Sequence, residues 1–342
     1  MQSAEWLLHW WNTFYDRSTD QLCILLVYDD DQLIAVAPWY IRSTWVKPRC
    51  LRFLGDGVVC SDHSSVLIQS GSEQKVTNAL VDWLDENAAS VWYAIGFSSI
   101  DQHDENLRAL MQGLSDKGYA IHESAAAGCW TVDMPASQDD YLASLSKNHR
   151  KRCRRWQREY FDTGRAEVVR CSDATEIGEY WKLLSDMKRK QFEGREEKSS
   201  YDFAEFNQFH NSVLPSLLES QQVELRKLIL DGQVVAAEYL LVKEKKFFCY
   251  QSGMERSKTR DGYGNLSIYA FFRDAISNGF QQIDFLRGDE SYKQHWNAER
   301  VPCVDYHVAA NTLPGTVQLT YRKTIDWLRE FRNTLVSPAA NH

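Results

Sequence analysis

The chain has 342 residues, of which 44% are hydrophobic and 25% charged, and its formal net charge is −8. This composition excludes a disordered chain, and the length is enough for two packed cores. The acidic balance argues against a general polyanion-binding protein. Eight cysteines without CxxC or metal-ligand spacing are typical of reduced thiols, so we expect no metal site. With no signal sequence and no run of about 18 apolar residues, we expect a cytoplasmic protein without a transmembrane segment.

The first part of the chain alternates between strand and helix patterns. Apolar runs at 22–28 and 33–41 flank three aspartates and predict a hairpin. The elements that follow are helices at 73–89 and 105–117 and strands near 91–97 and 129–132. This alternation predicts α/β layers, and Met134-Pro135 before a polar stretch is the best boundary. We therefore expect one domain over 1–136 and a second over 137–342.

The second part repeats this plan. Strands are expected at 223–230 and 234–242 around an Asp-Gly turn, with a third strand at 247–251. The expected helices are 141–161, 180–192, 203–218 and 319–334. The fold class that we predict is mixed α/β, with each domain holding a mixed, mainly antiparallel sheet flanked by helices.

A glycine-containing loop at 254–265 precedes another helix. Gly262 and Gly264 permit a close backbone approach, and Asn265 is expected to cap a helix that begins at Leu266, leaving N–H groups aimed at an anion. The loop lacks the lysine of a P-loop, and Ser267 replaces the third glycine of a dinucleotide fingerprint. The alternative interpretation is a flexible connector with a helix cap.

Charged residues concentrate around two later strands. Asp284 is expected on a buried face of a strand whose end carries Arg287, Asp289, Tyr292, Lys293 and Trp296, where α/β sheets commonly place their chemistry. Glu238 shares an apolar face with Ala236 and Leu240, which makes it a candidate general base. The alternatives are a structural Arg–Asp ion pair with a Trp plug, and a Glu238 that faces solvent or pairs with an arginine.

The helix expected at 141–161 has two contrasting faces. Its basic stripe consists of Lys147, Arg150, Lys151, Arg154, Arg155 and Arg158, and its inward stripe includes His149, Cys153 and Trp156. Unpaired like charges repel, so an anionic ligand would stabilise the basic stripe. The interpretations are a solvated face, a phosphorylated acceptor, the phosphates of a cofactor, or anionic lipid at a membrane surface.

The chain resembles the GNAT acyltransferases of the FemAB-like and CelD-like branch. The resemblance is carried by four segments in this order: SLSKNHRKRCRR, FFCYQSG, the glycine loop and IDFLRGDESYKQHW. EWLLHWW, IAVAPWYI and LRFLGDG fit the first half of that family. The resemblance implies two tandem GNAT-like domains, with the acyl-donor site in the second. It also implies acyl transfer from acetyl-CoA or another acyl-CoA to an amine or hydroxyl, by direct attack.

In such folds two strands separate and one of them pairs with the pantetheine arm, which implies strand 247–252 here, while the diphosphate rests on 262–266. The implied cofactor-binding residues are Tyr250, Ser252, Gly262, Gly264, Asn265 and Leu266. The chain departs from the family at Thr259, where Arg or Gln is usual, although Lys258 and Arg260 lie nearby.

Catalytic roles follow from the same resemblance. Glu238 or Asp284 would accept the proton of the attacking group, Tyr292 would protonate the departing thiolate, and Lys293 would stabilise the oxyanion. The residues expected to bind the acceptor are Arg150, Arg154, Arg287, Asp289 and Trp296.

The resemblance also suggests a saccharide or sugar-nucleotide acceptor in polysaccharide or cell-envelope biosynthesis. One alternative is an aminoacyl-tRNA-dependent peptidyltransferase of the FemAB type, disfavoured by the acidic net charge and the missing coiled-coil arm. Another is a catalytically silent scaffold of an exopolysaccharide system. The basic stripe could also contact an anionic membrane peripherally.

Overall fold

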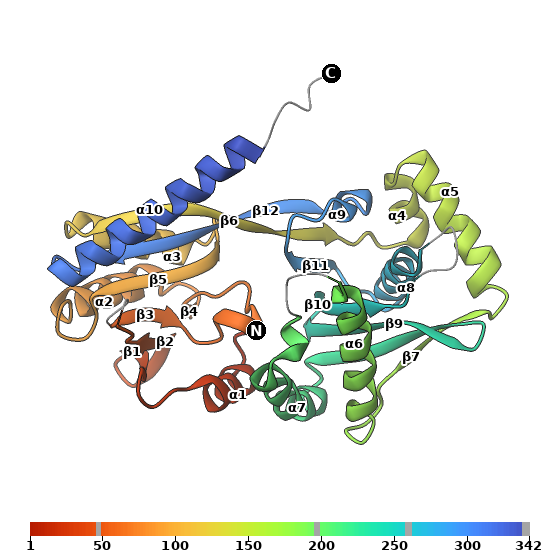
Figure 1. Ribbon diagram of the computed structural model, residues 1–342, viewed down its shortest axis with the longest axis horizontal. Coiled ribbons are helices and arrows are strands. Elements are labelled where there is room, and N and C mark those ends of the chain that lie inside the picture. Colours follow the sequence, from red (N-terminus) through yellow and green to blue (C-terminus); the bar gives the residue numbers. More distant parts are fainter. Residues whose placement is uncertain (46–48, 195–198, 257–261, 337–342) are drawn as a thin grey trace. The chain divides into compact units, whose positions relative to one another are not determined.

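The computed structural model describes residues 1–45, 49–194, 199–256 and 262–336, with side chains up to residue 326. The chain forms two compact units, drawn in Figure 1. Unit 1 contains Ser3–Phe14 and Gly128–Val301, and unit 2 contains Tyr15–Ala127 and the chain from Pro302 onwards. The compact units therefore do not follow a single cut at residue 136, because the first helix belongs with the second half of the sequence and the last strand with the first half.

Unit 1 is built on strands in the order β6-β11-β10-β9-β8-β7, all antiparallel to their neighbours except the β10–β11 pair. Their bounds are β6 Ala120–Asp133 (128–133 in this unit), β7 Ala166–Arg170, β8 Val223–Leu230, β9 Gln233–Lys243, β10 Lys246–Met254 and β11 Gln282–Arg287. The predicted three-stranded arrangement after residue 222 is confirmed, and Asp231 and Gly232 make its first turn with positive φ angles.

The helices of unit 1 are α1 Ala4–Phe14, α4 Gln138–Ser144, α5 Lys147–Trp156, α6 Ile177–Phe192, α7 Ala204–Glu219, α8 Tyr263–Ser277 and the short α9 Tyr292–His295. The single helix predicted over 141–161 is wrong. Leu145 has an extended ψ of 155°, and the Ser146 hydroxyl accepts a hydrogen bond from the His149 amide, so a new helix begins there. The predicted inward stripe is nevertheless buried, including His149, Cys153 and Trp156.

Close packing between α6 and β10 depends on Gly253. A Cβ at this residue would lie 2.8 Å from Met187 Cβ and 3.2 Å from the Leu184 carbonyl oxygen, so α6 would have to move. We expect Gly253→Ala to lower the free energy of unfolding by about 1–3 kcal/mol, measured by urea denaturation. Gly178→Ala is the matched control on α6, because no atom lies within 4 Å of that Cβ. Equal effects of the two substitutions would contradict this account.

A fully buried histidine makes the stability of unit 1 depend on pH. His210 lies among aromatic rings, with the Phe206 centroid at 4.4 Å and that of Trp181 at 4.8 Å, and burial holds its pKa well below the usual value. Below about pH 6.5 the unfolded chain binds a proton here that the folded chain excludes, so stability is full above that pH and falls below it.

We expect His210→Asn to reduce this acid dependence. The slope of unfolding free energy against pH below about pH 6.5 should decrease by up to ~1.4 kcal/mol per pH unit relative to the unsubstituted protein. Urea denaturation at three pH values measures both slopes. Identical slopes would show that His210 is not the group responsible.

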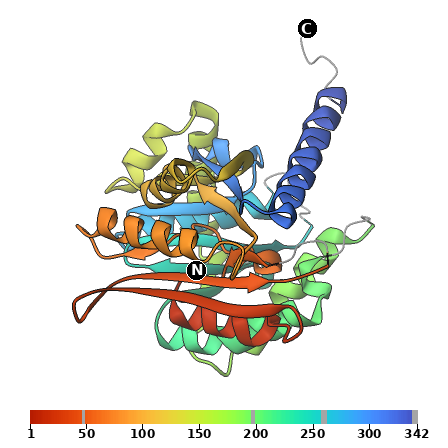
Figure 2. The same cartoon turned by 90° about the vertical axis from the view of Figure 1, so that its left-hand side faces the viewer.

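Unit 2 has the strand order β1-β2-β3-β5-β12-β6, with β4 paired to β2. The bounds are β1 Asp20–Asp29, β2 Gln32–Arg42, β3 Cys50–Phe53, β4 Leu67–Ile68, β5 Ala94–Asp101 and β12 Glu299–Ala309. Figure 2 shows the long β1–β2 hairpin that was predicted at 22–41. The helices α2 Glu73–Glu86, α3 Glu105–Asp116 and α10 Leu313–Val336 complete the unit.

The predicted fold class is confirmed, because both units have mixed, mainly antiparallel sheets with helices on them. Each unit has its own hydrophobic core. Within the described residues, no helix combines the length and the apolar character needed to cross a bilayer.

Candidate functional site

Strands β10 and β11 run parallel but pair over a short distance. The ladder joins three residue pairs: Lys246 with Gln282, Phe247 with Ile283, and Phe248 with Asp284. Beyond Phe248, β10 continues along β9 as far as Met254, whereas β11 stays with β6, where Arg287 faces Cys129. The two strands therefore separate, as expected for residues 247–252, and a gap opens beside 249–254.

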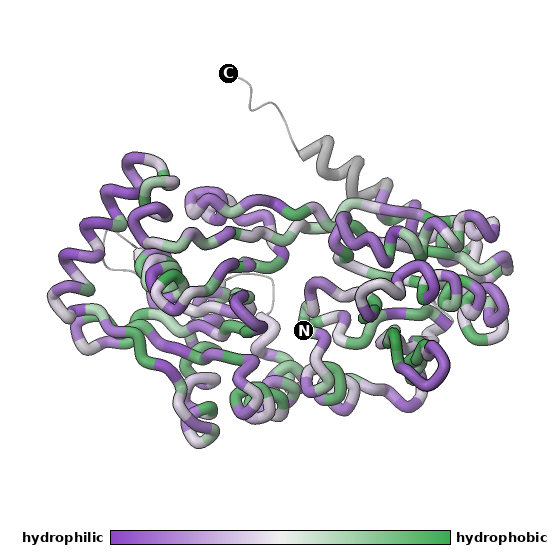
Figure 3. Tube along the Cα trace, turned by 180° about the vertical axis from the view of Figure 1, so that it is seen from behind, coloured by the Kyte–Doolittle hydropathy of each residue, from purple (hydrophilic) through white to green (hydrophobic). Residues whose placement is uncertain are grey.

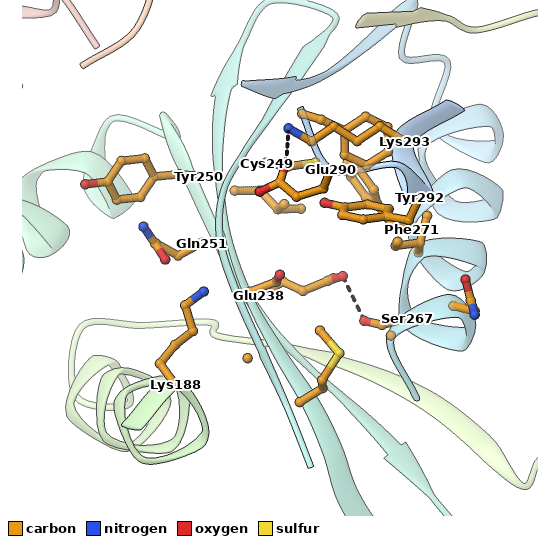
Figure 4. A pocket seen from close by; sticks show the side chains of 18 of the residues that line it. Lys188, Glu238, Cys249, Tyr250, Gln251, Ser267, Phe271, Glu290, Tyr292 and Lys293 are labelled. Carbon is orange, nitrogen blue, oxygen red and sulfur yellow. Dashed lines mark hydrogen bonds and ion pairs between the residues drawn. The ribbon is translucent and has the colours of Figure 1, made fainter. Parts of the chain in front are cut away.

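A cavity of about 560 Å³ occupies this gap. Its wall is formed by β9, by residues 249–254 of β10, by α8 as far as Phe271, and by the end of β11 with the segment after it. Two side chains from α6 complete the wall. Figure 4 shows Lys188, Tyr250 and Gln251 on the α6 side of β10, and Glu238, Ser267 and Phe271 on the α8 side. The volume is in the range of ordinary small-molecule sites.

The first turn of α8 borders the cavity, but its start differs from the prediction. The helix begins at Tyr263 after Gly262, whose φ of +71° suits glycine, so Asn265 is a helical residue and not the cap. Gly262, Gly264 and Asn265 line the cavity. Leu266 does not, because its side chain is buried in the core and its amide donates to the Gly262 carbonyl.

Gly264 has a packing role in addition to any ligand contact. A Cβ there would lie 2.7 Å from the Met254 sulfur, so the glycine lets α8 approach β10 closely. Thr259, where the chain departs from the family, lies outside the described residues, as do Lys258 and Arg260, which could supply a displaced phosphate contact.

Glu238 lies in the wall of the cavity between β10 and α8. Its Oε1 accepts a 2.8 Å hydrogen bond from the Ser267 hydroxyl, and its Oε2 lies 2.5 Å from Nε of Arg226 on β8. Arg226 is 2% exposed and stacks over the Phe271 ring at 4.5 Å. The alternative expected from the sequence, a Glu238 paired with an arginine, is therefore present, and this pairing fixes the carboxylate in the cavity.

Tyr292 and Lys293 also line the cavity, but they differ in how their polar groups are engaged. Burial, together with the nearby Cys249 and Glu290, raises the pKa of the Tyr292 phenol, so this group stays protonated. The buried Lys293 ammonium instead donates to the carbonyls of Leu286, Arg287 and Gly288 and pairs with Glu290 at 2.9 Å. An ammonium has three N–H donors, so this lysine anchors the turn after β11 and has none left for an oxyanion.

Three other predicted site residues do not reach the cavity. Asp284 is buried, and its carboxylate accepts the Leu286 amide at 2.7 Å. Asp289 pairs with Arg300 at 2.9 Å and accepts a hydrogen bond from Trp130, and Arg300 holds the pKa of its carboxyl below the usual value. Trp296 is fully buried against His149, so it is a core residue. The cavity does include Arg287, Tyr250 and Ser252.

Arg150 and Arg154 belong to a different surface. They lie on α5, whose exposed or half-buried cations include Lys147, Arg150, Lys151, Arg152 and Arg154. Figure 3 shows this helix as a strongly hydrophilic stretch. Neither arginine lines the cavity between β10 and β11.

The cavity residues that the sequence interpretation missed include Lys188 and Gln191 on α6, Cys249 on β10 and Ser267 on α8. Lys188 could have been found, because it lies four residues after Leu184 and seven after Trp181, on the buried stripe of α6. Cys249 offered no such signal. Burial raises the pKa of its thiol well above the usual value, which makes it unreactive.

Residues 147–294, which contain this cavity, match the family model described as an acetyltransferase (GNAT) domain. The part of the chain that holds the site is therefore similar to a GNAT domain, in agreement with the separated strands. Among curated proteins, none matches the chain in sequence.

Solved structures resemble the chain over most of its length. FemX superposes with a TM-score of 0.62 at 14% identity, covering 89% of this chain and 91% of FemX. A conserved protein of unknown function from Bacteroides thetaiotaomicron gives a TM-score of 0.55 at 13% identity, covering 89% and 88%. L-PGS from Bacillus licheniformis gives 0.51 at 16% identity, covering 87% and 88%. At these identities the likeness establishes the fold alone.

Proposed function

We propose that the protein is an acyltransferase that moves an acyl group from acyl-CoA to an amine or hydroxyl acceptor, in polysaccharide or cell-envelope biosynthesis. The observation that carries this proposal is the separation of β10 from β11 over a cavity that ends at the first turn of α8. Backbone groups of 249–254 can pair with the amides of a pantetheine arm, and the N-terminus of α8 suits a diphosphate. The saccharide acceptor and the CelD-like branch rest on the sequence resemblance.

The residues of the cavity supply acid and base for direct attack. Glu238 accepts the proton of the attacking amine as the C–N bond forms, since its two contacts leave further lone pairs free to accept. Tyr292 gives its phenolic proton to the sulfur as the C–S bond breaks, and exchange with solvent restores both groups. Backbone N–H groups of 249–254 that point into the gap stabilise the negative charge on the carbonyl oxygen. Asp284 and Lys293 have no part in this scheme.

Binding of the donor tests the proposal directly. Calorimetric titration with acetyl-CoA and with a longer acyl-CoA should give saturable binding, and native mass spectrometry of protein purified from cells should detect retained coenzyme A. A folded protein that binds neither donor would refute the acyl-CoA assignment.

Tyr292→Phe should separate acid catalysis from binding. The ring packing edge-on against Phe285 is retained, so the KM for acetyl-CoA should stay the same, while kcat falls about 100-fold because the thiolate leaves without a proton. Tyr28→Phe, at an exposed position in unit 2, is the control. Steady-state kinetics measure both, and an unchanged kcat for Tyr292→Phe would remove this residue from the mechanism.

The exposed cations of α5 favour a second candidate, an aminoacyl-tRNA donor in place of acyl-CoA. This candidate requires that activity in a cell extract is lost on treatment with ribonuclease and that binding weakens steeply with salt. Activity with purified acyl-CoA that survives ribonuclease would exclude it.

A further inference from the structure

Lys188 occupies an unusual position for a lysine. It lies on the face of α6 that packs on the sheet, in line with the buried Leu184 and Trp181. Its side chain extends toward the cavity beside Gln251, on the α6 side of β10 (Figure 4). Lysine is rare on the buried face of a helix, so its presence here indicates that the ammonium has a functional role in the cavity.

The ammonium of Lys188 has no hydrogen bond or ion pair with any residue that the structure describes, whereas other charged groups of the cavity are matched. Glu238 pairs with Arg226, and Glu290 pairs with Lys293 at 2.9 Å. Burial lowers the pKa of Lys188, and the more distant charge of Glu290 only partly opposes this. A partly buried cation without a close partner is unfavourable until an anion reaches it.

A second cavity meets the first at this lysine. It has a volume of about 750 Å³ and shares Lys188, Gln191 and Met254 with the first. Its remaining walls are Lys190, Phe192, Glu193, Glu255 and Arg256, of which Lys190 and Glu255 pair at 2.7 Å. Lys188 therefore stands between the proposed acyl-donor site and a separate space large enough for another small molecule.

We propose that Lys188 binds an anionic group, a carboxylate or a phosphate, of the acyl acceptor, which enters through the second cavity. This inference rests on the proposed function, because it assigns the α8 side of the gap to the donor. It defines the acceptor as an anionic amine or alcohol and makes Lys188 a residue that determines specificity. The side-chain oxygen of Gln191, whose amide nitrogen donates to the Met254 carbonyl, and the side-chain amide of Gln251 can contact the neutral part of such a molecule.

The test uses the full chain, the variants Lys188→Met and Lys188→Arg, and Lys182→Met as control. Lys182 lies on the same helix, is 77% exposed and pairs with Asp186 outside both cavities. Each protein is first titrated with acetyl-CoA by calorimetry. With acetyl-CoA saturating, it is then titrated with inorganic pyrophosphate and, separately, with citrate, so that phosphate and carboxylate recognition are distinguished.

We expect the unsubstituted protein, Lys188→Arg and Lys182→Met to bind at least one of the two anions, and Lys188→Met to bind it about 10- to 100-fold more weakly. Equal anion affinity in Lys188→Met, or no binding of either anion by the unsubstituted protein, overturns the inference. Loss of acetyl-CoA affinity in Lys188→Met also overturns it, because Lys188 would then belong to the donor site. Failure of the unsubstituted protein to bind acetyl-CoA would instead refute the proposed function.

Discussion

Glu238→Gln should abolish most of the acyltransferase activity. Glutamine keeps the shape of the side chain and can still contact the Ser267 hydroxyl, but it cannot accept a proton from the attacking group. We expect kcat/KM to fall by about 10²- to 10⁴-fold, the usual contribution of a general base. Steady-state kinetics with acetyl-CoA provide the measurement, at a temperature where circular dichroism shows the variant to be folded.

Glu224→Gln is the matched control for this experiment. Glu224 lies 3.6 Å from the same arginine, Arg226, but does not line the cavity. The substitution therefore perturbs the charged cluster without changing a residue of the site. Activity should stay close to that of the unsubstituted protein. If both glutamine variants lost activity equally, the integrity of the cluster and not proton transfer would explain the loss.

Arg226→Met should have the largest effect on stability. This arginine is 2% exposed and lies against three carboxylates, those of Glu238, Glu224 and Asp274. Removing its charge leaves these groups close together without a buried partner, and we expect the free energy of unfolding to fall by about 3–5 kcal/mol. Urea denaturation measures the change.

An exposed arginine in the same unit provides the comparison. Arg165 makes two 2.8 Å hydrogen bonds to Asp231 and is 49% exposed, so Arg165→Met should lower stability by no more than about 1 kcal/mol. The double variant Arg226→Met with Glu238→Gln should recover part of the loss, because one uncompensated charge is removed. Similar decreases in the free energy of unfolding for Arg226→Met and Arg165→Met would show that burial does not determine how much the ion pairs of Arg226 stabilise the protein.

Hydrophobic periodicity predicted the bounds of helices and strands closely where the turn residues and the apolar pattern indicated the same structure. The hairpin around Asp231-Gly232 was placed almost to the residue, because the turn and the alternating strands agree. The break between α4 and α5 was missed because the apolar stripe continues on both sides of it. The only local indication of the break is Ser146, whose hydroxyl caps α5, and one capping residue is a weak signal beside a continuous apolar stripe.

The candidate site was harder to predict, because it depends on tertiary register. Arg226 faces Glu238 because the β8–β9 register shifts between Leu228 and Ile229. A regular hairpin would instead have placed Arg226 opposite Ala237. Alternation along one strand therefore found Glu238 as a buried carboxylate but could not identify its partner. The hydrogen bonds from Lys293 to three carbonyls could not be predicted either, because those carbonyls belong to a turn whose shape the sequence alone does not determine.

The position of β12 affects how the protein is made. In the strand order of unit 2, residues 302–309 lie between β5 and β6, which are separated from them by more than half of the polypeptide. A growing chain on the ribosome would therefore hold β5 with one edge unprotected while all of residues 128–301 are translated. Strand edges of that kind invite association with other chains. We therefore expect synthesis to depend on chaperones until residues 302–309 have been translated.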